Sequence, residues 1–280
     1  MIAAGIVLYN ADLERLHENI MSVKNQVDIL ILIDNGSKNI DVIQEKYDKY
    51  DTIHLKKLGE NKGIAVALNE MSRIALSMGC EWILTLDQDS VCSANLIACY
   101  MNYINVPKIA MMSCKMKDRN YCLEKQEHFY NEYVEIEQCI TSGCFMNLKA
   151  AQDVGFFDEK MFIDYVDFDM CAMLKRKGYC IILCNFDGLL HELGRGELRR
   201  FIFKKHLITN HSPIRRYYYM RNVIYYTKKH KEYISLKRKW KELYGSIFYD
   251  IAVIVLYEKD KVSKLQHAFK GICDGIKMQV

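Results

Sequence analysis

The sequence has little that would produce a disordered, membrane-spanning or secreted chain. Its 280 residues include only two prolines and 14 glycines, which argues against long disordered linkers. No run of about 20 uncharged apolar residues occurs, and the most apolar segment, 247–257, is short and contains Asp250. The first residues lack the basic start of a signal peptide and lead directly into an apolar segment. The sequence therefore predicts a globular protein without a membrane-spanning helix.

The cysteines are not arranged for metal binding or for a disulfide framework. Their number, 11, is odd, and no two of them form a C-x-x-C pair. We expect reduced and mostly buried thiols, as in a cytoplasmic protein. A G-x-G-x-x-G motif is also absent, which argues against an NAD site of the Rossmann type.

The net charge of +4 conceals an uneven distribution. Residues 1–199 carry a net charge of −8 and residues 200–280 carry +12. A basic C-terminal segment on an acidic body favours an anionic partner surface. Aromatic and aliphatic residues from Tyr244 to Tyr257 accompany the basic ones, which favours a peripheral membrane contact over a nucleic acid. The alternative is that these helices pack on the catalytic domain or form a homodimer interface.

The N-terminal part alternates apolar strands with helices. Strands are expected at 3–8, 29–33, 52–55 and 82–86, and a helix is expected at 13–23. A second helix opens at 61–69 and runs to Ser77. This order predicts an α/β fold with a mostly parallel sheet flanked by helices. Ligands of such sheets bind at the carboxyl ends of the strands, so the residues that follow the strands are candidate site residues.

Two carboxylates follow the strand at 82–86. Asp87 and Asp89 are separated by one residue, so they can share one side of the chain. Two hard oxygen ligands in that place suit Mg²⁺ or Mn²⁺ carrying a diphosphate. The alternative is a polar turn, because Asp and Ser favour turns in general. Asp34 follows an earlier strand and is placed to accept hydrogen bonds from a base or ribose, although a simple Asn-Gly turn is its alternative.

Four segments together resemble the family 2 glycosyltransferases, which have the GT-A fold. They are Val-Leu-Tyr-Asn at 7–10, Ile-Asp-Asn-Gly-Ser at 33–37, Asn-Lys-Gly at 61–63 and Leu-Asp-Gln-Asp-Ser at 86–90. The last of these looks like the rhamnosyltransferase branch. The resemblance implies a GT-A catalytic domain at 1–210, a metal at Asp89, and a basic helical C-terminal region at 211–280 for acceptor, membrane or dimer contact. The nucleotide contacts that it implies are Tyr9, Asn10, Asp34, Asn61, Lys62 and Asp87.

The second half continues the resemblance. Thr141, Ser142 and Gly143 look like the start of the family's strand that lines the acceptor site. Segment 155–169 looks like the family's acidic segment that supplies the catalytic base, although Val166 stands where the family often has a Glu. We assign the base to Asp167, with Asp164 as the alternative, because a carboxylate there can take the proton of an attacking hydroxyl. These acids could also simply form the acidic first turn of a helix that runs to Lys177.

His191 falls where the family places a His near the metal or the diphosphate. A lone His is otherwise usually structural. Residues 192–213 are then expected to form a loop that closes over the donor and excludes water.

Residues 211–222 resemble an Arg-Arg-Tyr-Tyr-Tyr-x-Arg-Asn signature of rhamnosyltransferase-like members. Because Arg suits bidentate phosphate binding, this signature predicts contacts to a donor diphosphate or an acceptor pyrophosphate. The alternative is an amphipathic helix with an exposed basic face. The arginines concerned are Arg215, Arg216 and Arg221.

The resemblance implies an inverting glycosyltransferase of cell-surface polysaccharide synthesis, with Mg²⁺ or Mn²⁺ as cofactor. Its best-matching donor is dTDP-L-rhamnose, its acceptor is a saccharide or lipid-linked saccharide, and its place is the cytoplasm, at the inner face of the cell membrane. A UDP-hexose or UDP-galactofuranose donor is the first alternative. A metal-dependent nucleotidyltransferase would share the sheet and the paired aspartates but would need neither 155–169 nor 211–222. A non-catalytic binding module is the third alternative.

Overall fold

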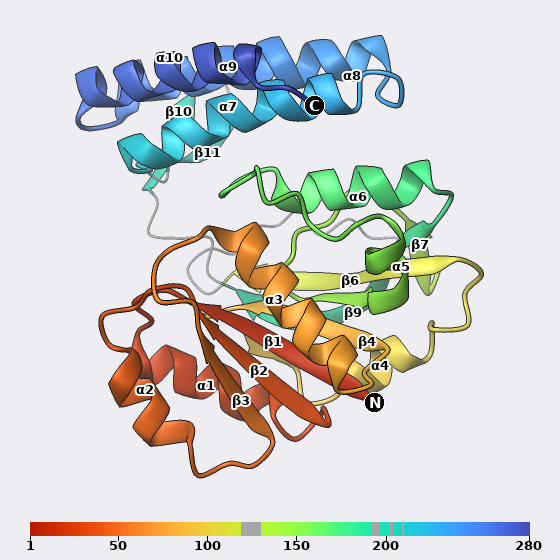
Figure 1. The fold of residues 1–280 in the computed structure, drawn as a ribbon. Helices are drawn as coiled ribbons and strands as arrows, with labels where there is room; N and C mark the ends of the chain where they lie inside the picture. Colours follow the sequence, from red (N-terminus) through yellow and green to blue (C-terminus); the bar gives the residue numbers. More distant parts are fainter. Residues whose placement is uncertain (119–129, 192–196, 202–203, 209) are drawn as a thin grey trace. The chain divides into compact units, whose positions relative to one another are not determined.

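The computed structural model describes residues 1–118, 130–191, 197–201, 204–208 and 210–280 (Figure 1). By their contacts the residues divide into two compact units. The sheet unit comprises Met1–Lys160 and Val166–Glu192, and the helical unit comprises Met161–Tyr165 and Leu193–Val280. The predicted boundary at residue 210 differs from this division, because the residues from 193 and the short segment 161–165 belong with the C-terminal helices.

The sheet unit is built around a nine-stranded sheet. β1 and its parallel neighbours β2 and β4 form the half of the sheet predicted from the sequence, with β3 parallel to β2 at the edge. β8 runs antiparallel beside β4, and β6, β9 and β5 follow, with β7 paired to β9. The strands are β1 (Ile2–Leu8), β2 (Ile29–Asp34), β3 (Ile53–Lys57), β4 (Trp82–Asp87), β5 (Val91–Cys92), β6 (Ile109–Asp118), β7 (Tyr133–Glu135), β8 (Cys144–Asn147) and β9 (Cys180–His191).

Helices cover both faces of this sheet. On one face, Ile6 and Leu8 of β1 belong to a buried apolar cluster with Leu16 of the first helix. On the other face, Gly5 leaves room for the third helix, since a Cβ there would lie 2.0 Å from the Met71 sulfur. This three-layer packing is the arrangement expected of an α/β fold. The helices of the unit are α1 (Leu13–Val23), α2 (Ile40–Tyr47), α3 (Ile64–Ser77), α4 (Leu96–Met101), α5 (Leu148–Asp153) and α6 (Val166–Arg176).

The helical unit contains one hairpin and a set of helices. The hairpin strands β10 (Glu197–Phe201) and β11 (Lys204–Ile208) are antiparallel, so the prediction of a loop throughout 192–213 is wrong in this part. Residues 192–196, 202–203 and 209 of that stretch lie outside the described residues. The helices are α7 (Pro213–Lys229), α8 (Leu236–Trp240), the π-helical η1 (Lys241–Gly245), α9 (Ser246–Tyr257) and α10 (Lys261–Lys277).

α7 and α10 are in very close contact. α7 begins with Ser212 as its N-cap and Pro213 in its first turn, both favoured at helix starts. α10 turns two glycines toward it: a Cβ on Gly271 would lie 2.3 Å from the Tyr217 carbonyl oxygen, and a Cβ on Gly275 would lie 2.7 Å from the Arg221 carbonyl oxygen. Any side chain at those two places would separate the helices.

Two further predictions bear on the whole chain. All cysteines in the described residues are free thiols, as the sequence predicts. Within the ranges that the structure describes, no helix combines the length and the apolar character that crossing a bilayer would need.

Candidate functional site

The carboxyl ends of β1, β2 and β4 lie side by side, because these strands are parallel neighbours. The residues that follow them are joined by hydrogen bonds. The Tyr9 N–H donates to Gln88 Oε1 and the Asn10 N–H donates to Ser37 Oγ, both at 2.9 Å. Asn10 Oδ1 in turn accepts from the Lys38 N–H at 2.9 Å. Three loops that are far apart in the sequence therefore form one edge, on which Tyr9 and Asn10 are exposed.

Asp34 determines the shape of the turn after β2. Its carboxylate is only 2% exposed and accepts from the N–H groups of Ser37 (2.9 Å) and Gly36 (3.3 Å). Gly36 has a φ of 85°, and a Cβ there would lie 2.7 Å from the Asn61 backbone nitrogen. The structure thus gives Asp34 the turn-forming role named as its alternative, and its contact with a nucleotide stays a prediction.

Asn35 connects this turn to the loop before α3. Its side-chain NH₂ donates to Asn61 Oδ1 at 3.0 Å, and its Oδ1 accepts from the Lys62 N–H at 2.8 Å. Asn61 Oδ1 also accepts from the Gly63 N–H at 3.1 Å. Asn61 is therefore held through its side-chain oxygen and Lys62 through its backbone N–H, next to the Asp34 turn. Both residues are exposed, and their contact with a nucleotide stays a prediction.

Asp87 and Asp89 lie at the end of β4 and in the turn that follows it. The Asn19 side chain donates to the Asp87 carbonyl oxygen at 2.6 Å, and the Asp87 N–H donates to Ser142 Oγ at 3.2 Å. The hydroxyls of Ser90 and Ser142 are hydrogen-bonded at 2.8 Å and buried. The backbone on both sides of Asp89 is thus anchored. Asp87 and Asp89 are both partly exposed residues, although one carboxylate oxygen of Asp89, Oδ1, is buried.

The predicted acceptor segment adjoins this turn. Thr85 of β4 donates its hydroxyl to the Thr141 carbonyl oxygen at 2.5 Å and accepts the Gly143 N–H at its own carbonyl at 2.8 Å. Gly143 has a φ of 74°, and a Cβ there would lie 2.9 Å from Leu189. Thr141, Ser142 and Gly143 therefore lie at the same edge as Asp87, and their contact with an acceptor stays a prediction.

Asp167 lies in the first turn of α6, beside the chain that leads to this segment. Cys171, one turn further along α6, has its sulfur 4.0 Å from that of Cys139, and the Cys139 N–H donates to it at 3.5 Å. The Cys144 thiol contributes most to raising the pKa of Cys139, and the Asp167 carboxylate adds to that rise. The first turns of α6 thus lie close to Cys139, two residues before Thr141 in the chain.

Of the two predicted metal ligands, Asp89 follows β4 and His191 ends β9. His191 is the last residue of β9, and its side chain lies outside the described residues. In the described part of the chain, no group of three or more His, Cys, Asp and Glu side chains is placed to hold a metal ion. Mg²⁺ needs no such group when one or two carboxylates bind it together with substrate phosphates. The oxygen ligands of Asp87 and Asp89 fit that mode of binding.

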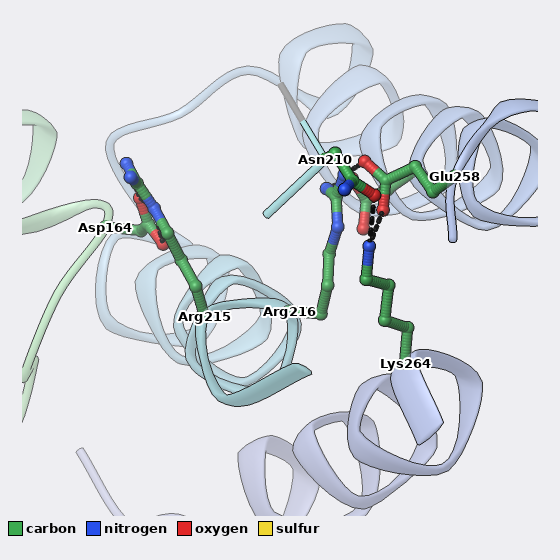
Figure 2. Close-up of polar contacts among 7 residues, drawn as sticks. Asp164, Asn210, Arg215, Arg216, Glu258 and Lys264 are labelled. Atoms are coloured by element: carbon green, nitrogen blue, oxygen red, sulfur yellow. Dashed lines mark hydrogen bonds and ion pairs between the residues drawn. The ribbon is translucent and has the colours of Figure 1, made fainter. Parts of the chain in front are cut away.

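Two of the three predicted phosphate-binding arginines of α7, Arg215 and Arg216, have carboxylate partners in the helical unit (Figure 2). Arg215 lies 3.0 Å from an Asp164 carboxylate oxygen. Arg216 is buried and pairs with Asp250 and with Glu258. These contacts give Arg216 a structural role, and its predicted phosphate contact stays a prediction.

Lys264 of α10 completes the buried charge cluster around Arg216. Its Nζ lies 3.0 Å from Glu258 and 2.6 Å from Asn210 Oδ1. Burial raises the pKa of Asp250 to about 6, against the lowering effect of Arg216. The cluster thus joins the start of α7 to α9 and α10 by charges that largely balance.

A cavity of about 210 Å³ lies beside these charges, lined mainly by residues of α7 and α9. His211 faces it, and burial, followed by the charges of Arg215, Arg216 and Lys264, lowers the pKa of His211 to about 3. The imidazole is therefore neutral at pH 7.

Arg221, the third predicted phosphate ligand, lies further along α7. Its guanidinium is 4.7 Å from the centre of the Tyr218 ring, and its Nε donates to Asn222 Oδ1 at 3.0 Å. A phosphate contact by Arg221 stays a prediction.

Comparisons with known proteins bear on the fold and on the enzyme class. Residues 4–128 match the family described as Glycosyl transferase family 2. This stretch contains the ends of β1, β2 and β4. These residues are therefore similar to a family 2 glycosyltransferase domain. The enzyme class predicted from the resemblance, a glycosyltransferase, is thereby confirmed.

A relative and two solved structures are similar to nearly the whole chain. A Shigella flexneri protein named dTDP-rhamnosyl transferase RfbF is 28% identical over 291 residues, covering 99% of this chain and 95% of the relative. The structure of S. aureus TarS 1–349 with UDP-GlcNAc has a TM-score of 0.65 at 15% identity, covering 99% of this chain and 80% of TarS. Mannosyltransferase PcManGT from Pyrobaculum calidifontis with GDP-Man and Mn²⁺ has a TM-score of 0.57 at 11% identity, covering 100% and 76%. The predicted GT-A fold is confirmed.

Three side chains that hold the candidate site in place were missed in the sequence. They are Asn19, Asn35 and Ser90. Asn19 carried a usable signal, because it is a polar residue on the helix face that also carries Leu16 and Ile20. A buried polar side chain in an apolar stripe needs a partner, and here the partner is the Asp87 carbonyl.

Proposed function

We propose that this glycosyltransferase transfers L-rhamnose from dTDP-L-rhamnose to a hydroxyl of a saccharide or lipid-linked saccharide, with inversion. The observation that carries the proposal is the edge formed by the ends of β1, β2 and β4, where Asp87 and Asp89 adjoin the Thr141–Gly143 segment. The choice of donor is supported by the relative named dTDP-rhamnosyl transferase, which matches nearly the whole chain. A UDP-sugar donor is the second candidate, because TarS with UDP-GlcNAc shares the fold.

In this proposal the nucleotide lies across the loops after β1 and β2. Tyr9 is exposed there and offers a flat face for stacking. Asn10, Asn61 and the Lys62 ammonium group surround the same place and can bind the ribose and phosphates. The side-chain oxygens of Ser37, Asn35 and Gln88 accept hydrogen bonds from backbone N–H groups of these loops, so the site is formed before the donor arrives.

Asp87 and Asp89 would hold the metal ion, as Mg²⁺ or Mn²⁺. When bound, such a cation stabilises the negative charge that develops on the leaving nucleoside diphosphate. Two carboxylates at an anchored strand end suit this role, since both ions prefer oxygen ligands. The structures of PcManGT and of GalNAc-T7 contain Mn²⁺, which supports a divalent ion in this fold.

Asp167 would accept the proton of the acceptor hydroxyl as its oxygen attacks the anomeric carbon. Attack on the face opposite the leaving nucleotide inverts the configuration of that carbon. Asp164 is the alternative base, but its carboxylate is held by Arg215 at 3.0 Å. The role of receiving the proton therefore goes to Asp167 in our proposal.

The helical unit supports a peripheral membrane contact. α9 buries its charged residue and exposes an apolar one, which is the reverse of what is expected for a helix in water. Its one charged residue, Asp250, is 6% exposed, whereas Phe248 is 76% exposed. Trp240 and Tyr244 extend the exposed apolar side through α8 and η1, with their rings stacked 4.3 Å apart. A face of this kind is suited to the apolar layer beneath lipid headgroups.

Basic residues beside this face support an anionic lipid surface as its partner. Lys237 and Lys241 are exposed next to Leu236 and Trp240. Near such a surface each Lys or Arg contributes on the order of 1 kcal/mol of attraction. The inner face of the cell membrane, where a lipid-linked acceptor would reside, is therefore the proposed place of action. A second copy of the chain is the alternative partner for this face.

The proposed donor site is tested by the shift in melting temperature caused by dTDP, UDP, GDP and CDP, each with and without Mn²⁺. We expect a Mn²⁺-dependent shift with dTDP, of the size that corresponds to about 2.7 kcal/mol at 100 times the dissociation constant. Asp89→Asn should abolish the Mn²⁺-dependent part. Asp41→Asn, which removes an equally negative but highly exposed carboxylate, serves as the matched control. A shift with UDP instead would replace the donor, and no shift with any nucleotide would overturn the proposal.

A further inference from the structure

The five residues before α6 have an unusual backbone. Met161–Tyr165 belong to the helical unit by their contacts. Asp164 and Tyr165 have φ values of 64° and 66°, two successive residues in the left-handed region without a glycine. Such a conformation is unfavourable for residues with a side chain and persists only where the surroundings hold it.

Asn222 of α7 holds this backbone directly. Its buried side-chain NH₂ group donates to two carbonyl oxygens, those of Ile163 at 2.8 Å and Asp164 at 2.9 Å. Its Oδ1 accepts from Arg221 Nε at 3.0 Å, which fixes the orientation of the amide. One side chain therefore ties down the carbonyls immediately before and within the left-handed pair.

The side chains of the segment are held by the same helix. The Phe162 ring stacks on Tyr218, with centroids 4.6 Å apart and planes 14° from parallel. A carboxylate oxygen of Asp164 lies 3.0 Å from Arg215. Figure 2 shows the two side chains next to each other.

Tyr165, the last residue of the segment, is buried and held at two levels. Its ring packs on that of Tyr226 at 5.4 Å, and its hydroxyl donates to Glu242 of η1 at 3.0 Å. Residues 162–165 thus each have a partner in the helical unit.

The chain passes from this segment directly into α6, which begins at Val166 and carries Asp167 in its first turn. The direction in which α6 starts is set by the backbone angles of the residues just before it. We propose that Asn222 and Arg215 are positioning residues for Asp167, acting through the backbone of residues 163–165. This inference rests on the proposed function, in which Asp167 is the base. It gives part of the 211–222 signature a role in catalysis that does not require phosphate binding.

The test compares Asn222→Ala with Tyr217→Phe. Tyr217 lies on the same helix, and its hydroxyl donates to Asp274 of α10 at 2.9 Å, so its loss removes a hydrogen bond without touching residues 161–165. Amide hydrogen exchange is followed in peptides covering 161–169, and kcat and KM for the donor are measured. We expect Asn222→Ala to speed exchange in these peptides about tenfold or more and to lower kcat about 10- to 100-fold, with KM and dTDP binding unchanged. Tyr217→Phe should change neither.

Arg215→Gln is a second variant in case Asn222→Ala does not fold, because the Arg215 side chain is 43% exposed. It should lower kcat in the same direction by a smaller factor, and Arg215→Lys should restore part of the loss. Equal kcat values for Asn222→Ala, Arg215→Gln and Tyr217→Phe in an active enzyme would overturn this inference alone. A wild type that binds nucleotide but transfers no sugar would overturn the proposed function, and this inference with it.

Discussion

Single buried polar side chains determine the geometry of the proposed site. Asn19 holds the carbonyl group of Asp87, Ser142 holds its N–H group, and Asn222 holds the backbone before α6. Each is a buried polar side chain, and leaving its buried partner unsatisfied costs about 1–3 kcal/mol. The reactive carboxylates themselves are placed by these neighbours, which carry no reactive group.

The assignment of the base can be tested at the level of one carboxylate. Asp167→Asn keeps the shape of the side chain and removes its capacity to accept a proton. We expect kcat to fall about 10²- to 10⁴-fold, the usual contribution of a positioned general base, with little change in dTDP binding. Single-turnover rhamnosyl transfer measures the effect.

Asp164→Asn is the matched variant for that prediction, because it changes the same group three residues away. It removes the ion pair with Arg215 and should lower kcat by no more than about tenfold, since the pair is partly exposed. The reverse order of the two effects would make Asp164 the base.

His211 is predicted to make the helical unit sensitive to acid. Its pKa is lowered to about 3 in the folded protein, mainly by burial and then by Arg215, Arg216 and Lys264, against a usual value of 6.5. Below pH 6.5 the unfolded chain therefore binds a proton that the folded chain does not. The stability that comes from neutral His211 is complete above pH 6.5 and is lost as the pH falls toward 3.

The measurement is the free energy of unfolding in urea at pH 6.5 and 4.5, for wild type and His211→Gln. At 1.36 kcal/mol per pH unit, the wild type should lose about 2 kcal/mol more than the variant over this interval. The comparison is needed because Asp250, which lines the same cavity, acts with the opposite sign. The raised pKa of Asp250, about 6, makes the folded state bind a proton at a higher pH than the unfolded state does. Lowering the pH therefore stabilises the folded state through Asp250. Parallel losses in wild type and variant would show that His211 is not held neutral.

At the scale of elements, the packing of α10 on α7 depends on two glycines spaced by four residues. Gly271 and Gly275 lie on one side of α10, and any Cβ there would approach the backbone of α7, which cannot move aside as a flexible side chain can. The pair of helices is thus in contact at the closest distance that the backbone allows. This contact supports α7, which carries Asn222 and Arg215.

Gly271→Ala is therefore expected to destabilise the protein by about 1–3 kcal/mol, as overpacking does in well-packed interiors. Gly245→Ala is the matched substitution in η1, where a Cβ would only reach ordinary contact with Lys241 at 3.9 Å. That change should stabilise the helix by about 0.5–1 kcal/mol. The midpoint temperature of thermal unfolding should fall in Gly271→Ala and rise in Gly245→Ala. Equal changes in the two variants would show that α10 does not pack closely on α7.

The elements that could be predicted from the sequence are those whose pattern is local. The apolar runs at 3–8, 29–33 and 82–86 are bounded by polar turns, and the structure places strands there to within one residue at either end. The hairpin of β10 and β11 could not be predicted in this way, because Glu-Leu-Arg-Arg-Phe and Lys-Lys-His-Leu-Ile show no regular alternation of apolar and polar residues.

At the scale of the whole molecule, the sequence indicates which distant residues meet in one case only. That case is residues at the ends of strands, because the sheet topology brings these ends together. Tyr9, Asp34 and Asp87 come together for that reason, because parallel neighbours end at the same edge. The partners of Arg215 and Arg216 could not be predicted. Asp164 and Asp250 are 51 and 34 residues away, and only the packing of helices brings them to α7. The sequence pattern around these arginines is equally compatible with phosphate binding and with ion pairs inside the protein.

The distribution of charge and apolar surface also belongs to this scale and leads to the last prediction. The chain should sediment with vesicles that contain anionic lipid, and less so as the salt concentration rises, because the basic C-terminal region carries the excess positive charge. Phe248→Glu should weaken this binding at least tenfold, since burying a Phe side chain contributes about 1.5–3 kcal/mol. Val42→Glu makes the same change at an exposed apolar residue of the sheet unit and should leave binding unchanged. If Phe248→Glu instead dissociates a dimer in sedimentation equilibrium and wild type ignores the vesicles, the apolar face of α9 contacts a second copy of the chain.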